Sequence, residues 1–371
     1  MHLEPMGAWC LLVMCTVLMV IFLSVAHFSR LKKKVPLFYS WIGAIAVFGG
    51  ALAFFLPIAL NSGFGPTDDG RVLRQLILYT TGGVLGVITL GESHRKNNQE
   101  KEKNENDHTR QVYAERRSRY TTAIEQLANE NAAVRLGGIY TLTGLVDEWL
   151  TDKSVKEEND RRQEGQVIIN NLCAYIRSPF NLANSHYILD KDNPTEEEIE
   201  EYGRENFTKH KLEFYEEKDT RQAILYEIKL RLNNGYTMDE ENEKIPLEGP
   251  WSKFTYDFSK AIFFYPFDLS GSFFSHPVIS KETVFANKFN VSGSIFNEET
   301  NFSNARFTRQ DFSETINFKG VRFKEIFKFN GAIFESKADF RRMHAESEIE
   351  FSRCHFKIGA LFSGSTFKDA Y

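Results

Sequence analysis

The stretch that decides the fold is NFKGVRFKEIFKFNGAIFESKADF, residues 317–340, in which Phe318, Phe329 and Phe340 recur every eleven residues. Phe323 and Phe334 fall between them. The same spacing continues on both sides of this window. Ten phenylalanines follow it: Phe263, Phe274, Phe285, Phe296, Phe307, Phe318, Phe329, Phe340, Phe351 and Phe362. So regular a spacing indicates a repeated structural unit of about half that length, with these ten rings as its core stack.

The residues around each phenylalanine alternate between apolar and polar. Two positions earlier the residue is mostly apolar, as at Ala305 and Ile316, and the residue between is mostly polar, as at Arg306 and Asn317. This period of two predicts short strands with two side chains inward and one outward. Gly, Ser, Asn and Asp in the remaining positions favour turns. Strands and turns at a fixed period predict a solenoid, in which each coil covers the next.

The segments FSNARF, FNGAIF and FESKADF resemble the pentapeptide-repeat family, whose five-residue unit has a central Leu or Phe and a small residue two positions before it. The resemblance implies an all-β, right-handed, four-sided β-helix over residues 251–371. This chain departs from a strict pentad, because its rungs alternate between five and six residues. The resemblance supplies no catalytic residues.

The N-terminal region, residues 1–92, is predicted to lie in a membrane. Residues 8–28 and 37–60 are apolar over the length that a helix needs to cross a bilayer, and residues 72–91 form a third candidate with Arg74 near one end. Two spans are the alternative to three. Gly82 and Gly86 form a GxxxG pair that permits close packing of transmembrane helices, and the alternative is an ordinary glycine-rich helix.

Basic residues in the first loop set the predicted orientation. The second loop has Asp68 and Asp69 instead, so the positive-inside rule places the first loop in the cytoplasm. Three spans then put residues 93–371 in the cytoplasm, at a bacterial inner membrane, whereas two spans put them outside. The topology determinants are Arg30, Lys32, Lys33 and Lys34.

Between the membrane region and the solenoid we expect a polar connector, residues 93–120, and a helical region, residues 121–250, with a strongly acidic insert over 190–219. The string VRLGGIY, residues 134–140, resembles the helical segment of bacterial membrane-anchored pentapeptide-repeat proteins. Arg135 is a candidate contact for a partner; the alternative is that it only supports a helical hairpin. Trp251 is a candidate cap for the first coil.

The sequence contains no Walker loop, no GxSxG elbow and no HExxH helix. His344 and His355 are eleven residues apart, which would place them on opposite sides of a coil and argues against a shared metal. We therefore predict no enzyme activity, no catalytic residue, no cofactor and no metal. Four cysteines without close paired spacing outside the apolar N-terminus indicate no disulfide framework.

The charge of the chain argues against functions that involve nucleic acid. The chain carries a net charge of −5, and residues 258–371 contain 15 Lys and Arg against 13 Asp and Glu. Some pentapeptide-repeat proteins inhibit topoisomerases by mimicking the shape and charge of DNA, and this near-neutral surface argues against that activity and against nucleic-acid binding. No small-molecule substrate is evident.

The function that we expect is a non-enzymatic scaffold, tethered to the lipid bilayer, whose solenoid rod binds a protein or a second copy of itself. The last coil has no obvious cap, so Phe362 and Phe367 are candidate contacts of an end-to-end homodimer. The alternative is a membrane effector, such as a pore-forming stress or phage-defence protein, that the cytoplasmic solenoid controls.

Overall fold

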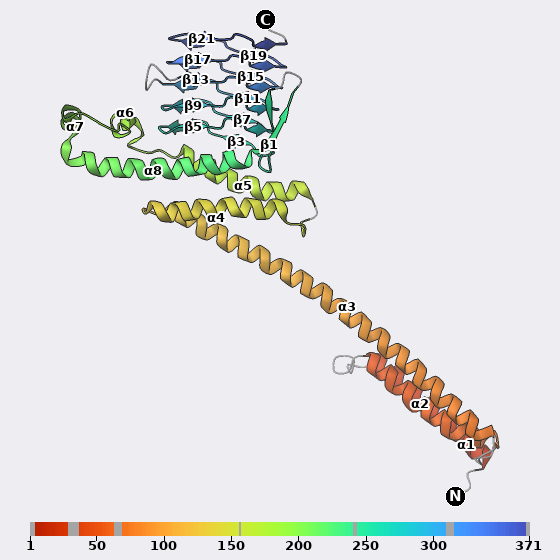
Figure 1. Ribbon diagram of the computed structural model, residues 1–371. Helices are drawn as coiled ribbons and strands as arrows, with labels where there is room; N and C mark the ends of the chain where they lie inside the picture. The colour runs from red at the N-terminus through yellow and green to blue at the C-terminus, as the bar shows by residue number, and fades with distance from the viewer. Residues whose placement is uncertain are drawn as a thin grey trace. The chain divides into compact units, whose positions relative to one another are not determined.

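The computed structural model describes residues 4–28, 37–62, 69–155, 157–239, 243–308 and 315–368. The chain divides into two compact units, residues 1–110 and residues 111–371, and each is considered by itself below. Figure 1 shows helices in the first unit and both helices and strands in the second.

The first unit contains α1 (Pro5–Phe28), α2 (Leu37–Ala59) and most of α3 (Asp69–Leu127). Each has a segment long and apolar enough to cross a membrane, which confirms the three apolar helices predicted from the sequence. Ala8, Leu12 and Ala59 form a small buried cluster between α1 and α2. The predicted polar connector is helical, because α3 continues unbroken through it. Arg30, Lys32, Lys33 and Lys34 lie outside the described residues.

Helices form the first part of the second unit. They are the end of α3, α4 (Ala132–Thr151), α5 (Glu158–Arg177), the short η2 (Ala183–Ser185), α6 (His186–Leu189), α7 (Glu196–Tyr202) and α8 (Arg204–Arg231). Asn131 starts α4, since its side chain accepts a hydrogen bond from the Ala133 backbone N–H. Thr195 and Glu198 form a capping box at α7. The acidic insert is therefore ordered as α7 and the first half of α8.

An antiparallel hairpin, β1 (Asn233–Met238) and β2 (Lys244–Glu248), follows α8. The sequence predicted a helical region up to residue 250, but in the structure the last helix ends at Arg231 and the hairpin takes its place. Asn233 ends the helical path, because its side-chain oxygen accepts a hydrogen bond from the Gly235 N–H, and Gly235 adopts a φ of +101°. Glycine reaches that conformation without a steric penalty.

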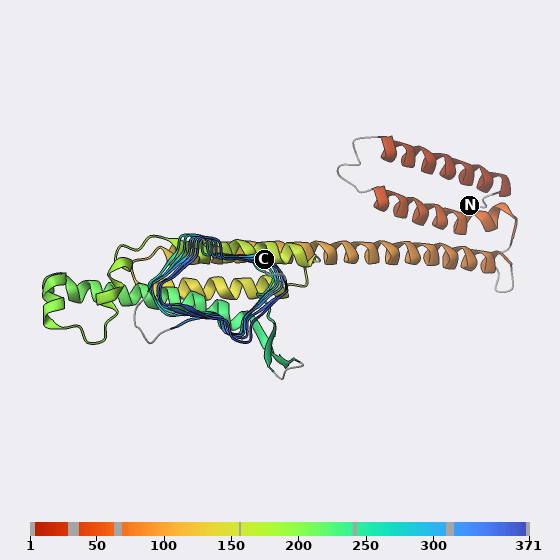
Figure 2. The same ribbon diagram turned by 90° about the horizontal axis from the view of Figure 1, so that it is seen from above.

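The solenoid consists of four parallel sheets of five strands each. The β3 sheet contains β3 (Tyr256–Asp257), β7 (Val278–Ile279), β11 (Thr300–Asn301), β15 (Phe327–Lys328) and β19 (Ile349–Glu350). The β4 sheet contains β4 (Ile262–Phe263), β8 (Val284–Phe285), β12 (Arg306–Phe307), β16 (Ile333–Phe334) and β20 (His355–Phe356). The β5 sheet contains β5 (Phe267–Asp268), β9 (Phe289–Asn290), β13 (Thr315–Asn317), β17 (Lys337–Asp339) and β21 (Ala360–Leu361). The β6 sheet contains β6 (Phe273–Phe274), β10 (Ile295–Phe296), β14 (Arg322–Phe323), β18 (His344–Ala345) and β22 (Thr366–Phe367). This confirms the four-sided β-solenoid, and Figure 2 shows its coils superposed along their common axis.

The register of the sheets explains the eleven-residue spacing and corrects one consequence of it. Phe263 pairs with Phe285, twenty-two residues later, but Phe296 pairs with Phe323, because the third coil is five residues longer. The ten predicted phenylalanines therefore do not form one column. Eight are 0–2% exposed, whereas Phe351 is half-buried and Phe362 is 38% exposed.

The rings stack in separate columns instead. One column runs along the β4 sheet with ring centroids 4.6–5.2 Å apart, and it contains Phe263, Phe285, Phe307, Phe334 and Phe356. Another follows the β5 sheet, where Phe318, Phe340 and Phe362 stack at 4.9 and 5.0 Å. Neighbouring columns meet edge to face, as for Phe329 and Phe340 at 5.8 Å. Both geometries are favourable for aromatic pairs, so the interior is filled with rings.

Left-handed residues at two corners explain why rungs of five and six residues alternate. They lie in the six-residue rungs, after the β3 and β5 sheets, at Lys260, Gly271, Glu282, Gly293, Asn304, Gly320, Gly331, Arg342, Arg353 and Gly364. At several of these corners an Asp or Asn side chain accepts a hydrogen bond from the backbone N–H two residues on, as Asp268 does from Ser270 at 3.0 Å. Such Asx turns redirect the chain at a fixed point in each coil.

The helices close the first coil of the solenoid. Trp251 is fully buried, and its indole N–H donates to Asp147 Oδ1 of α4 at 2.8 Å. The Arg231 guanidinium of α8 lies 4.8 Å from the centroid of the same ring. Buried residues of α4, α5 and α8 share one hydrophobic core with the solenoid. Figure 1 shows these helices layered below the coil that begins at β3.

Candidate interaction site

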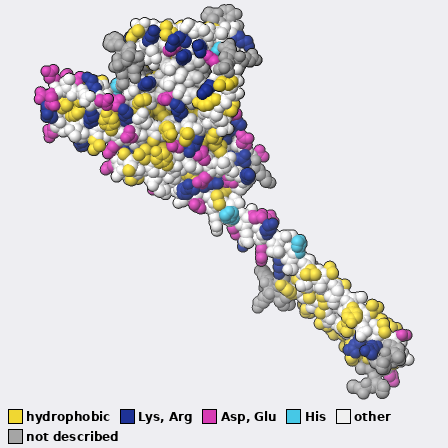
Figure 3. Space-filling model, viewed as in Figure 1, with side chains coloured by type: hydrophobic (Ala, Val, Ile, Leu, Met, Phe, Trp, Pro, Cys, Tyr) yellow, Lys and Arg dark blue, Asp and Glu magenta, His cyan; other side chains and the backbone are white. Residues whose placement is uncertain are grey.

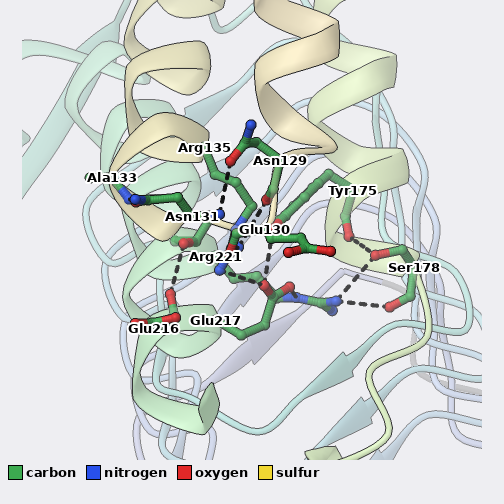
Figure 4. A network of polar contacts seen from close by, with 11 residues as sticks. Asn129, Glu130, Asn131, Ala133, Arg135, Tyr175, Ser178, Glu216, Glu217 and Arg221 are labelled. Carbon is green, nitrogen blue, oxygen red and sulfur yellow. Dashed lines mark hydrogen bonds and ion pairs between the residues drawn. The ribbon is translucent and has the colours of Figure 1, made fainter. Parts of the chain in front are cut away.

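A buried polar network joins α4, α5 and α8 (Figure 4). Arg221 of α8 is 2% exposed, and its Nε donates to Glu217 Oε1 at 2.6 Å. Its two terminal nitrogens donate to the backbone oxygens of Ile176 at 2.7 Å and Ser178 at 2.9 Å, at the end of α5. The free carbonyls at a helix C-terminus attract cations, so Arg221 fastens α8 to α5.

Arg135, the predicted partner contact, belongs to this network. Its Nη1 donates to the backbone oxygens of Asn129 at 3.1 Å and Glu130 at 2.8 Å, and its Nη2 lies 3.5 Å from Glu217 Oε2. The side chain is 11% exposed. These contacts fit a role of Arg135 in supporting the helical hairpin, and its contact with a partner stays a prediction.

Tyr175 completes the network by donating its hydroxyl to Glu217 Oε2 at 3.0 Å. Burial, and then the negative charge of Glu217, raise the pKa of Tyr175, so the phenol stays protonated and remains a donor. The Arg221 guanidinium also lies 5.6 Å from the ring centroids of Tyr175 and Phe264. These contacts join residues of three helices to one another, and we therefore assign the network a role in stability.

The β1–β2 hairpin occupies one side of the solenoid. Asp239 pairs with Arg322 of β14, and Glu243 pairs with Arg342 at 3.1 Å. Glu248 accepts a hydrogen bond from Ser275 at 2.7 Å. These contacts reach the first, third and fourth coils, at or next to β6, β14 and β18, so the hairpin covers part of the face that the β6 sheet forms.

Charges on the solenoid are paired between neighbouring coils. Glu335 contacts Arg306 at 2.7 Å and Lys357 at 3.0 Å, and Lys328 contacts Glu299 at 2.9 Å. Figure 3 shows basic and acidic side chains interspersed over this unit on the face in view. His344 and His355 belong to different sheets, and the described residues contain no group of three or more His, Cys, Asp or Glu suited to a metal ion.

The last coil differs from the first. Phe362 and Phe367 are each 38% exposed, whereas most aromatic residues of the first coil are buried. In the described part of the chain, β19, β20, β21 and β22 are the edge strands of the four sheets at this end, as β3, β4, β5 and β6 are at the end beside the helices. Edge strands offer unpaired N–H and C=O groups to another strand. This coil is therefore the candidate interaction site.

Gly82 and Gly86 are open in the first unit, since a Cβ added at either would meet no atom within 4 Å. The close approach of α2 and α3 lies elsewhere, at Gly49, where an added Cβ would overlap the Thr81 side chain. This contact of Gly49 was not predicted from the sequence. Glycine at position 49 lets the two helices pack closely.

Comparison of the chain with protein-family models, with curated proteins and with solved structures finds no match. The likeness to pentapeptide-repeat proteins therefore rests on the repeat and on the Phe-rich parallel solenoid that it forms.

Proposed function

We propose that this chain is a non-enzymatic interaction protein of the bacterial inner membrane, of the membrane-anchored pentapeptide-repeat type. Its apolar helices span the membrane, and its solenoid stands in the cytoplasm and binds protein. The observation that carries this proposal is the contrast between the two ends of the solenoid. One end is covered by helices through Trp251, while the other presents Phe362, Phe367 and four edge strands.

Because the interior of the solenoid is filled with aromatic rings, a partner can bind only to its outer surface. Rings at 4.6–5.2 Å fill the axis of the solenoid, so a partner has only the outer faces and the last coil to contact. The faces carry charges that are already paired, which reduces their value for a new charged partner. The last coil combines aromatic side chains with free backbone groups, and aromatic residues are enriched at protein interfaces.

A second copy of the chain is the partner that we favour. Two identical last coils meeting about a two-fold axis would bury Phe362 and Phe367 and pair edge strands across the contact. Such an interface is self-complementary and closed, so it stops at a dimer.

The mass of the full chain in mild detergent, measured by light scattering after gel filtration, tests this proposal. We expect a dimer for the wild type and a monomer for Phe362→Asp, because burial of an unpaired carboxylate costs several kcal/mol. Tyr226→Asp is the control, since Tyr226 is 64% exposed on α8 of the opposite end, and it should leave the dimer intact. A monomeric wild type, or an unchanged dimer in Phe362→Asp, would contradict self-association.

Orientation is a separate part of the proposal. A reporter that is active only in the cytoplasm, fused after Tyr371, should be active in a bacterial host. Activity of a periplasmic reporter at the same position would instead support two spans and an external solenoid.

A membrane effector is the second candidate, favoured by the openness of Gly82 and Gly86, which leaves this face of α3 free for assembly. It predicts that overexpression depolarises the membrane and that Gly82→Leu or Gly86→Leu relieves the effect. An undisturbed membrane potential at matched expression would leave only the anchoring role.

A further inference from the structure

A groove runs between α1 and α2 in the first unit. Its volume is about 520 Å³, within the range of ligand pockets. Leu18 and Phe22 line it from α1, and Gly43, Val47 and Ala51 line it from α2. The groove exists because the α2 wall is built partly from small residues. At Gly43 an added Cβ would meet no atom within 4 Å, so the space beside it is open.

The dimensions of the groove match one chain of a lipid. Its lining on α2 extends from Tyr39 to Ala51, which corresponds to about 18 Å along a helix and so to roughly one leaflet of a 30 Å hydrocarbon core. The groove is apolar along this length, so it suits one hydrocarbon chain.

The polar groups lie at one end of the groove. Tyr39 and Ser40 line that end, and the Lys96 ammonium of α3 lies 3.4 Å from the Tyr39 hydroxyl and 5.6 Å from the centroid of its ring. The neighbouring Arg95 is paired with Glu92 at 2.9 Å. Lys96 acts on Glu92 only electrostatically, without an ion pair within 4.0 Å among the described residues, and its ammonium contacts the neutral Tyr39 hydroxyl, so it can still pair with an anion.

We propose that this groove binds a membrane phospholipid with an anionic head group. One acyl chain lies along Leu18, Phe22, Gly43 and Ala51, and the phosphate accepts hydrogen bonds from Lys96 and the hydroxyls of Tyr39 and Ser40. Apolar burial of the chain supplies affinity, and the lysine selects for negative charge. The inference rests on the proposed insertion of these helices in a membrane.

Native mass spectrometry of the full chain in detergent tests the site, with phosphatidylglycerol and phosphatidylcholine of identical acyl chains as probes. The wild type should retain phosphatidylglycerol at least tenfold more tightly than phosphatidylcholine. Gly43→Leu fills the groove and should weaken both lipids at least tenfold. Gly83→Leu makes the same change at an open position of α3 outside the groove and should have no effect.

The head-group contact has its own pair of variants. Lys96→Gln should abolish the preference for phosphatidylglycerol while leaving the binding of phosphatidylcholine unchanged, and Lys101→Gln on the same helix should preserve the preference. Equal lipid retention by Gly43→Leu and the wild type would overturn the proposal. So would a wild type that carries a second copy of the chain in place of lipid, if Gly43→Leu releases that copy. Alkaline extraction of membranes checks insertion of every variant, so failure of the anchoring role is distinguished from failure of the lipid site.

Discussion

Arg221 shows how one buried charge is tolerated in the core of the second unit. Removal of one partner of a buried ion pair costs about 3–5 kcal/mol, because the other charge loses its compensation. Arg221 has Glu217 and two backbone carbonyls as partners, and three aromatic rings lie within 6.0 Å of its guanidinium carbon. Arg221 thus links α8 to the end of α5, because Ile176 and Ser178 lie more than forty residues before it in the chain, while Glu217 lies one turn earlier in α8.

We therefore expect Arg221→Met to lower the free energy of unfolding by about 3–5 kcal/mol, measured by denaturant titration of the full chain in detergent and followed by circular dichroism. Arg204→Met is the matched control. Arg204 pairs with Glu196 on the surface and is 61% exposed, so its loss should cost at most about 1 kcal/mol. The double variant Arg221→Met, Glu217→Met should recover part of the loss, because both charges are then removed. Equal costs for Arg221→Met and Arg204→Met would show that the network adds no stability.

At the scale of elements, the β1–β2 hairpin is held against the solenoid mainly by side-chain contacts, and less by the hydrogen bonds between its own two strands. Isolated two-stranded hairpins are marginally stable, and most residues of β1 are exposed. The ion pairs of Asp239 with Arg322 and Glu243 with Arg342 tie the hairpin to the solenoid. These contacts decide whether residues 233–248 stay docked.

Arg322→Gln should therefore raise the amide hydrogen-exchange rates of the hairpin about tenfold, the change expected for a loss of about 1.4 kcal/mol. Arg306→Gln provides the control, since Arg306 makes a similar ion pair with Glu335 on a different sheet. Exchange in the hairpin should be unaffected by that change. Identical exchange in both variants would assign the docking to backbone and apolar contacts alone.

Elements also show what the sequence could predict. The period of two within each rung and the repeated Phe predict the four-sided solenoid and its buried rings, because every coil repeats the same local chemistry. The longer third coil was not predicted, since five added residues leave the eleven-residue spacing of phenylalanines intact while changing which sheet each ring joins. The contact of Arg135 with Glu217 and the pair of Asp239 with Arg322 were missed, because each joins residues about 80 positions apart.

At the scale of the whole molecule, the second unit joins a helical cap to a stack of coils in one hydrophobic core. Each coil of a solenoid is stabilised mainly by its neighbours, so stability varies along the axis. The coil of β3 to β6 has helices on one side and a coil on the other. The coil of β19 to β22 has a described neighbour on one side only.

Hydrogen exchange of the full chain under conditions that keep it monomeric should thus be slowest near β3–β10 and fastest at β19–β22. Trp251→Ala removes the indole that packs under the first coil and donates to Asp147. A large core truncation of this kind costs about 3–5 kcal/mol. The variant should therefore raise the exchange rates of both the helices and the first coils at least tenfold. Phe367→Ala, at the exposed coil, should change exchange only locally. If Trp251→Ala accelerated exchange in the helices and left β3–β10 unchanged, the cap and the solenoid would be independent folding units despite their shared core.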